Sequence, residues 1–209
     1  MLRRILGILL WAVAGAAHAS PTLLVVGDSI SAGYGLDNGQ GWVALLSARM
    51  ARDFPGWRVD NASVSGDTSA GGLARLPALL RQRRPAVVVV ELGGNDALRG
   101  LALSHTRDNL TRMLELAHRA GARTLLVGMQ IPPNYGPVYT QRFAALYPDV
   151  ARATGSALVP FLLAGIAEHR DAFQPDGIHP TAASQPALLA NVWPRLAPLL
   201  RATGAEHAR

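Results

Sequence analysis

The sequence contains neither cysteine nor lysine in its 209 residues. The lack of cysteine excludes a disulfide framework, thiolate metal sites, iron–sulfur clusters and a cysteine nucleophile. The lack of lysine excludes a lysine Schiff base and a P-loop lysine, and it makes all 20 basic side chains arginine. Charged residues are scarce at 16%, whereas apolar residues reach 49%, so the chain is neither disordered nor fibrous. This length and composition predict one domain with a core of moderate size.

Residues 1–19 have the pattern of a secretory signal peptide. Arg3 and Arg4 precede an uncharged apolar run, and Ala17-His18-Ala19 has the small residues of a cleavage site. The apolar run is shorter than the roughly 20 residues that a membrane-spanning helix needs. We therefore expect a signal peptide at 1–19 and a single domain over 20–209, located in the periplasm or secreted.

The charge of the remaining chain predicts few macromolecular partners. After Arg3 and Arg4 are removed, 18 basic and 14 acidic side chains leave a net charge of +4. The densest basic cluster, residues 81–84, lies between a helical pattern and a strand, as a solvated helix end would. Nucleic-acid binding requires clustered positive charge on a docking motif, and neither is present. We expect a monomer that binds a small-molecule substrate and makes at most transient contact with a membrane surface.

Strand-like and helix-like segments alternate five times along the chain. The expected strands cover residues 22–26, 57–61, 86–91, 123–129 and 157–159. The expected helices cover residues 41–52, 69–83, 104–120, 138–154 and 182–201. Four consecutive valines in the third strand indicate burial on both faces, as in a parallel sheet. The order predicts an α/β domain with right-handed crossovers, a kink or break at Pro77, and a frayed tail over 202–209.

Polar clusters stand where the expected strands end. Ser29 follows the first strand, residues 61–68 follow the second and residues 93–96 follow the third, while residues 176–179 precede the last helix. Parallel sheets place ligand sites at the carboxyl ends of their strands. Four polar clusters at one edge of the sheet therefore predict an active site there.

Ser29 and His179 are the candidates for a nucleophile and its base. Ser29 is either an activated nucleophile or a residue that caps a turn, and Ser31 replaces the second glycine of the G-x-S-x-G elbow. His179 lies in a turn-rich segment, three residues after Asp176, whose carboxylate would orient the imidazole. The alternative is that Asp176 forms an Asx-turn that caps the last helix.

Asn95 and Gly66 are the candidate donors for an oxyanion. Asn95 follows two glycines, so it is either part of a turn or a donor whose side-chain amide binds the negative charge that develops on the substrate oxygen. Gly66 has no side chain and lets a substrate approach its backbone N–H. We expect Asp28, Asp67 and Asp96 to be structural acceptors for loop amides.

The polar clusters resemble the four blocks of the SGNH (GDSL) hydrolase family, in the family's order. The blocks are Gly27-Asp28-Ser29-Ile30-Ser31, Ser65-Gly66-Asp67-Thr68, Gly93-Gly94-Asn95-Asp96 and Asp176-Gly177-Ile178-His179-Pro180. Three further segments look like the family's bacterial periplasmic thioesterase, lysophospholipase and arylesterase branch. They are residues 61–68, 72–80 and 133–136. The resemblance implies a flavodoxin-like three-layer α/β/α fold with a five-stranded parallel sheet.

The resemblance also implies a mechanism without metal or organic cofactor. Ser29 would be the nucleophile, His179 the general base and acid, and Asp176 the orienting acid. The backbone amides of Ser29 and Gly66 and the side chain of Asn95 would form the oxyanion hole. The implied activity is hydrolysis of acyl esters and thioesters, including lysophospholipids and aryl esters.

The sequence indicates the segments that bind the acyl chain, and the length of that chain, less directly than it indicates the catalytic residues. We expect residues 69–80 and 131–137 to line the acyl pocket, because their apolar residues suit an acyl chain. The alternative activity is that of a short-chain carbohydrate or small-ester acetylesterase of the same family. A non-catalytic binding module would not need Ser29, Asp176 and His179 together. A flavin site would need a loop of Ser and Thr residues that binds the phosphate. A metal phosphoesterase would need more His and Asp ligands than Asp176 and His179.

Overall fold

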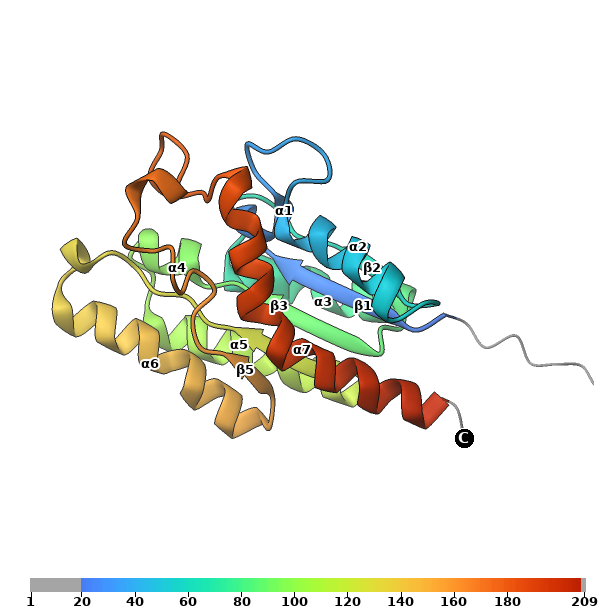
Figure 1. Cartoon of the computed structure of the whole chain (residues 1–209). Coiled ribbons are helices and arrows are strands. Elements are labelled where there is room, and N and C mark those ends of the chain that lie inside the picture. The colour runs from blue at the N-terminus through green and yellow to red at the C-terminus, as the bar shows by residue number, and fades with distance from the viewer. Residues whose placement is uncertain (1–19, 208–209) are drawn as a thin grey trace, which may run out of the picture.

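The computed structural model describes residues 20–207, which form a five-stranded parallel sheet covered by helices (Figure 1). The strand order is β2-β1-β3-β4-β5, with every neighbouring pair parallel. The strands are β1 (Thr22–Gly27), β2 (Arg58–Asn61), β3 (Val87–Glu91), β4 (Arg123–Val127) and β5 (Ala157–Val159). The expected α/β class and all five strands are confirmed. The expected signal peptide lies outside the described residues.

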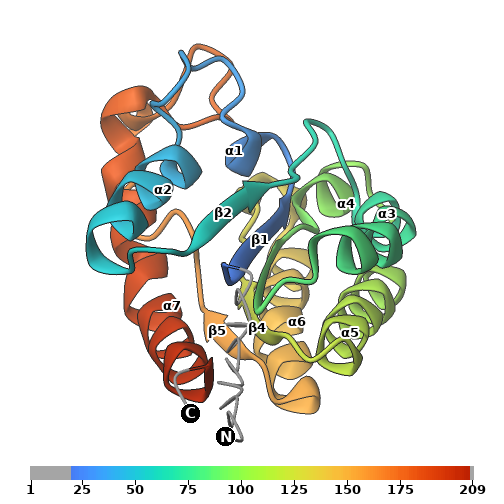
Figure 2. The same ribbon diagram turned by 90° about the vertical axis from the view of Figure 1, so that its right-hand side faces the viewer.

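Five long helices cover the two faces of the sheet. They are α2 (Trp42–Asp53), α3 (Ser69–Arg83), α5 (Leu103–Arg119), α6 (Pro137–Thr154) and α7 (Gln185–His207). Helices α2 and α7 pack on one face, and α3, α5 and α6 pack on the other (Figure 2). Both faces are therefore covered, and Val87–Val90 of β3 are fully buried, as the run of valines predicts.

Shorter elements and the proline-containing helices depart from the expectations. No periodic signal in the sequence marks α1 (Ser29–Ala32), α4 (Gly94–Leu98) or three 3-10 turns. The turns are η1 (Pro133–Tyr135), η2 (Arg170–Ala172) and η3 (Ala182–Ser184). Of the kink or break expected at Pro77, the break is wrong, because α3 runs through this residue with Leu76 and Leu80 buried. Packing of the apolar face outweighs the one backbone hydrogen bond that proline removes.

The last helix also differs from its expectation at both ends. Residues 182–184 form the turn η3 rather than the start of the α-helix, and α7 begins at Gln185. The expected fraying from residue 202 is wrong, since α7 continues to His207 and Thr203 is buried. No helix that the structure describes has the length and apolar composition needed to cross a membrane.

The carboxyl ends of β1 and β3 meet at one edge of the sheet. The strands are in register through Gly27 of β1 and Glu91 of β3. A Cβ atom at Gly27 would lie 2.7 Å from Cβ of Ser31 and 2.9 Å from Oε2 of Glu91. Glycine is therefore required at position 27, where β1 turns directly into α1.

Candidate active site

Ser29, His179 and Asp176 form a continuous line of hydrogen bonds at this edge. The Ser29 Oγ lies 2.8 Å from Nε2 of His179, although 150 positions separate the two residues. The His179 Nδ1 lies 2.7 Å from Oδ2 of Asp176. The remaining oxygen, Oδ1 of Asp176, accepts hydrogen bonds from the backbone N–H groups of Ile178 and His179. The Asx-turn and the orienting carboxylate, weighed as alternatives, thus occur together in Asp176, but the turn does not cap the last helix, which begins at Gln185.

These hydrogen bonds hold Asp176 in its ionised form. The bond from His179, followed by the two backbone bonds, lowers the pKa of Asp176 to about 2. An ionised carboxylate accepts a hydrogen bond from Nδ1 and so favours the tautomer with Nε2 free to accept. The geometry therefore presents a basic nitrogen to the hydroxyl of Ser29.

The short helix α1 fixes the position of Ser29. The Asp28 side chain caps this helix by accepting from the backbone N–H of Ile30 at 3.0 Å. Gly33 ends the helix in the left-handed conformation, with φ at 76°. The first N–H groups of a helix have no intrahelical partner, so the Ser29 N–H points outward from the helix start. Ser29 is half-buried, which leaves its hydroxyl reachable.

Hydrogen bonds tie Asn95, one of the expected oxyanion donors, to residues next to Ser29 and Gly66. The Nδ2 of Asn95, on α4, donates to Oδ2 of Asp28 at 3.1 Å and to the Asp67 carbonyl at 3.0 Å. These two bonds tie Asn95 to the residue before Ser29 and to the residue after Gly66. Gly66 has φ at 78°, a conformation that favours glycine. Because both Nδ2 hydrogens are engaged, Asn95 must exchange one bond to donate to an oxyanion.

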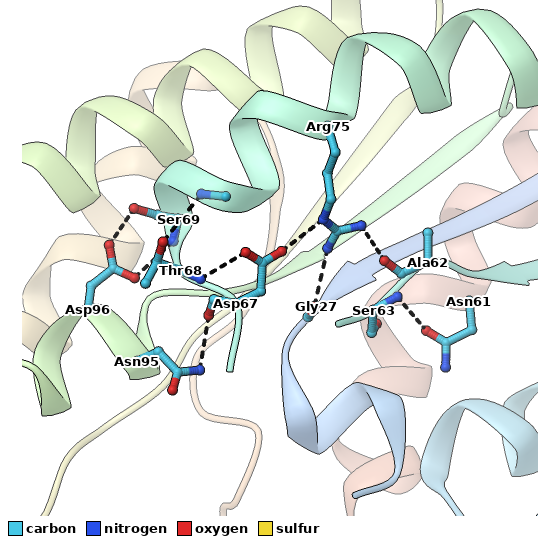
Figure 3. A network of polar contacts seen from close by, with 11 residues as sticks. Gly27, Asn61, Ala62, Ser63, Asp67, Thr68, Ser69, Arg75, Asn95 and Asp96 are labelled. Carbon is cyan, nitrogen blue, oxygen red and sulfur yellow. Dashed lines mark hydrogen bonds and ion pairs between the residues drawn. The ribbon is translucent and has the colours of Figure 1, made fainter. Parts of the chain in front are cut away.

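Arg75 of α3 joins the ends of the first two strands to the Gly66 turn (Figure 3). Its Nε donates to Oδ2 of Asp67 at 2.8 Å, and its two remaining nitrogens donate to the carbonyls of Ala62 and Gly27. The sequence pattern assigned Arg75 no role. The only feature of the sequence that could have indicated this role is the position of Arg75, two helical turns after the Thr68 cap.

The remaining aspartates expected to be structural have that role. Asp96 accepts from the backbone N–H of Ser69 at 2.8 Å and from its hydroxyl at 2.5 Å (Figure 3). Asp67 accepts from the Thr68 backbone N–H in addition to Arg75. These bonds attach the start of α3 to α4, and therefore to Asn95.

Two buried acids lie directly behind Ser29. Burial raises the pKa of Asp28 to about 6, against the opposing hydrogen bonds from Ile30 and Asn95. Burial, followed by repulsion from Asp28, raises the pKa of Glu91 well above its usual value. The Ser31 Oγ donates to Oε2 of Glu91 at 2.6 Å, anchoring the middle of α1 to β3. Sequence reasoning missed this pair, because the carboxylate lies at the end of an otherwise apolar strand.

A hollow lies on the surface of α5 and α6. It has a volume of about 780 Å³, and its wall includes Leu103, Tyr135, Val138 and Tyr139. The Tyr139 hydroxyl donates to the carbonyl of Ala97, two residues after Asn95. Through Tyr139, the wall of the hollow therefore contacts α4, the helix that carries Asn95.

The two segments expected to line an acyl pocket have different locations. Part of the 131–137 loop, from Tyr135 to Pro137, lines the hollow. The 69–80 segment does not line it, because α3 packs against α5 and buries Leu76 and Leu80 in the core. Its apolar residues serve core packing, which a helical pattern cannot distinguish from ligand contact.

Three other histidines of the described residues lie on the surface, away from helix α1. His105, His118 and His169 are exposed on other elements. Between residues 20 and 207, no three His, Asp or Glu side chains gather closely enough to hold a metal ion. The expectation that the reaction uses no cofactor stays a prediction.

Comparison with known proteins identifies the family. A model of the GDSL-like Lipase/Acylhydrolase family matches residues 25–185. The chain is 58% identical to Esterase TesA of Pseudomonas aeruginosa over 87% of its own length and 90% of that protein. It is 42% identical to Thioesterase 1/protease 1/lysophospholipase L1 of Escherichia coli K12, over 88% and 87% of the two chains. A solved structure named "Crystal Structure of TesA" superposes with a TM-score of 0.83 at 58% identity, covering 85% of this chain and 99% of that one.

The chain belongs to the GDSL-like lipase/acylhydrolase family, also called SGNH hydrolases. The resemblance inferred from four short blocks is thus confirmed, as are the fold class and the enzyme class. The protein is a hydrolase of carboxylic esters and thioesters.

Proposed function

We propose that the protein hydrolyses acyl esters and thioesters through an acyl-enzyme on Ser29. The observation that carries the proposal is the line from Ser29 Oγ through His179 to Asp176, with hydrogen bonds of 2.8 Å and 2.7 Å. A serine becomes nucleophilic when a positioned base is within hydrogen-bond reach, and a third group must orient that base. Ser29, His179 and Asp176 meet both requirements.

Proton transfer through His179 accounts for both halves of the reaction. Nε2 takes the Ser29 proton as Oγ attacks the carbonyl carbon, and it then returns that proton to the departing alcohol or thiol. Water next replaces the leaving group, and His179 takes a proton from it. The resulting hydroxide attacks the acyl carbon, the bond from that carbon to Ser29 Oγ breaks, and His179 returns the proton to Oγ as the acid leaves. The ionised Asp176 stabilises the imidazolium during each transfer.

The oxyanion would be stabilised by three N–H donors around Ser29. They are the backbone N–H groups of Ser29 and Gly66 and the side-chain amide of Asn95. Arg75 supports this arrangement, because it binds Asp67, the residue between Gly66 and the Thr68 cap. Preorganised donors are effective because they need no reorientation as charge develops. The Asn95 amide would exchange its bond to the Asp67 carbonyl for one to the substrate.

The substrate class that we propose is medium- to long-chain acyl esters, including lysophospholipids, with aryl esters and thioesters also accepted. The hollow lined by Tyr135, Val138 and Tyr139 supports this class, because an acyl chain in it would lie against the helix that carries Asn95. The names of the two relatives, an esterase and a thioesterase/lysophospholipase, agree with this class. The alternative is a short-chain carbohydrate or small-ester acetylesterase, which would not need the hollow.

Hydrolysis of p-nitrophenyl esters from acetate to palmitate tests the proposal. The chain beginning at Ser20 is compared with Ser29→Ala, whose folding is checked by circular dichroism. We expect activity to peak at medium or long chains and to be lost in the variant. A peak at acetate would favour the alternative substrate class. Equal rates from the two proteins would contradict the role of Ser29.

Asn95→Ala tests the oxyanion hole in the same assay. We expect kcat to fall by roughly 10²- to 10³-fold with little change in KM, because the amide bond forms chiefly in the transition state. Since Asn95 also donates to Asp28 and Asp67, the variant's melting temperature is the control for structural damage. An unchanged kcat would remove Asn95 from the oxyanion hole.

We also propose that the protein is exported and acts as a monomer. Residues 1–19 form the signal peptide in this proposal, and residues 20–209 form the single catalytic domain. An exported enzyme meets lysophospholipids and external esters rather than cytosolic acyl-CoA. Periplasmic or extracellular esters would then be its working substrates, with thioester hydrolysis a capacity of the same site.

A further inference from the structure

Tyr34 places an exposed aromatic ring against the imidazole of His179. Its ring centroid lies 4.6 Å from that of His179, with the planes inclined at 41°. The side chain is 53% exposed, although tyrosine rings usually bury more of their surface in a folded protein. Tyr34, Leu36 and Pro180 surround the Ser29 and His179 side chains in a small surface depression. The ring therefore contacts the base while about half of the Tyr34 side chain stays exposed.

Gln174 holds Tyr34 in this position from a distant part of the chain. Its Nε2 donates to the Tyr34 carbonyl at 2.9 Å and to the Pro180 carbonyl at 3.2 Å. Its backbone N–H donates to the His179 carbonyl at 2.7 Å. Gln174 thus links the loop after α1 to the His179 turn, and the two segments lie side by side (Figure 2).

Gly35, the residue after Tyr34, leaves room for the Gln174 side chain. Gly35 has φ at 73°, and a Cβ atom there would clash with Oε1 of Gln174. A larger side chain would therefore displace Gln174 as well as strain the backbone. Glycine at position 35 therefore preserves the hydrogen bond from Gln174 to Tyr34, the residue that contacts His179.

The direction of proton transfer says which part of the substrate meets Tyr34. The imidazole must return its proton to the leaving oxygen or sulfur, so the leaving group lies within hydrogen-bond reach of Nε2. Tyr34 contacts this imidazole, whereas the Asn95 amide is bonded to Asp28 and to the Asp67 carbonyl. A group bonded to the leaving atom would therefore extend along the face of the Tyr34 ring.

We propose that Tyr34, held by Gln174, forms the wall of the leaving-group site and favours flat, aromatic leaving groups. The inference rests on the proposed roles of Ser29 and His179. Stacking of a ring on Tyr34 adds an attraction beyond the area that it buries, so aryl esters benefit more than small alkyl esters. Tyr34 acts on specificity by direct contact, and Gln174 is a positioning residue.

Two butyrate esters with different leaving groups test this inference. The kcat/KM of phenyl butyrate and of ethyl butyrate is measured for the chain from Ser20 and for Tyr34→Ala, Tyr34→Phe and Gln174→Ala. This parameter covers every step through departure of the leaving group. We expect Tyr34→Ala to lower the value for the phenyl ester about tenfold more than that for the ethyl ester. Tyr34→Phe keeps the ring and should retain the preference.

The double variant separates positioning from a general structural effect. Since Gln174 acts through Tyr34, Tyr34→Ala/Gln174→Ala should lose no more aryl preference than Tyr34→Ala alone. Equal losses on both esters in Tyr34→Ala, or independent losses in the double variant, would overturn the inference. Ser29→Ala is assayed in parallel. Activity in that variant would contradict the proposed function, whereas an inactive Ser29→Ala with an unchanged ester preference in Tyr34→Ala would contradict this inference alone.

Discussion

The Asp28 side chain joins the nucleophile side of the site to the oxyanion side. One oxygen caps α1 through Ile30, and the other accepts from the Asn95 amide. Both bonds require an acceptor, yet the carboxylate is almost fully buried, at 3% exposure. Burial favours the neutral form, and the pKa of Asp28 rises to about 6. Asp28 is ionised and buried at neutral pH, so the residue that positions Ser29 and Asn95 lowers the free energy of unfolding there.

Asp28→Asn should reveal this cost as a pH-dependent change in stability. Between about pH 4 and pH 6 the folded protein keeps a proton on Asp28 that the unfolded chain loses, so stability falls as the pH rises through this window. Asparagine cannot ionise. Relative to the unsubstituted protein, the variant should therefore gain up to about 3 kcal/mol more at pH 8 than at pH 4.

Urea denaturation at the two pH values measures that difference. The substitution also disturbs the bond to Asn95, which adds a cost that does not depend on pH, so the comparison between pH values is the informative quantity. A stability difference between the variant and the unsubstituted protein that is the same at both pH values would contradict the raised pKa.

At the scale of elements, helix α3 connects the sheet core to the candidate site. Thr68 caps its start, and Arg75, two turns on, reaches the ends of β1 and β2. Its buried Gly72 faces Leu92, the residue that follows β3. The close approach of α3 to this strand end is what brings the Asp67–Arg75 pair to Asn95.

Gly72→Ala tests this close approach. Replacing a helical glycine by alanine ordinarily stabilises a protein by about 0.5–1 kcal/mol. Here the new Cβ would clash with Cδ1 of Leu92 and lie 3.2 Å from Cε of Met113, and both of these side chains are fully buried. We expect the free energy of unfolding to fall by about 1–3 kcal/mol instead.

Ala74→Gly, at an exposed position of the same helix, is the control. It should cost the ordinary helix penalty of about 1 kcal/mol, which calibrates the propensity of α3. A stabilising Gly72→Ala would mean that α3 does not pack tightly on the end of β3.

For the whole molecule, the site exists only when both ends of the domain are in place. Ser29 follows the first strand, while Asp176 and His179 precede the last helix. The parallel sheet brings these segments to one edge, with β1 between β2 and β3. The chain enters β1 at the opposite edge, so cleavage before Ser20 need not disturb the site.

Export of the full chain is the prediction at this scale. Expressed in a Gram-negative bacterium, the protein should appear in the periplasmic fraction with Ser20 as its first residue, as intact-mass spectrometry would show. Ala19→Arg should block cleavage, because small residues are needed next to the cut. A chain that starts with an added Met before Ser20 is the control and should stay in the cytoplasm. Recovery of the full chain with residues 1–19 still attached would contradict the proposed cleavage.

Local sequence was sufficient for the architecture and for selecting the candidate site residues. Four valines in succession predict a strand buried on both faces, and β3 has that environment. The Asp176–His179 spacing predicts their hydrogen bond, because three residues of a turn fix the distance between the side chains. Such features depend on neighbours in the chain, which the sequence states directly.

Only the tertiary structure decided which distant groups meet. Nothing near Tyr34 in the chain indicates Gln174, 140 positions away, and nothing near Arg75 indicates the carbonyls that it binds. The same limit applies to residues 69–80, because Leu76 and Leu80 repeat with helical period whether they line an acyl pocket or lie in the core, where the structure buries them. Periodicity shows that a face is apolar, while the packing of other elements determines what covers it.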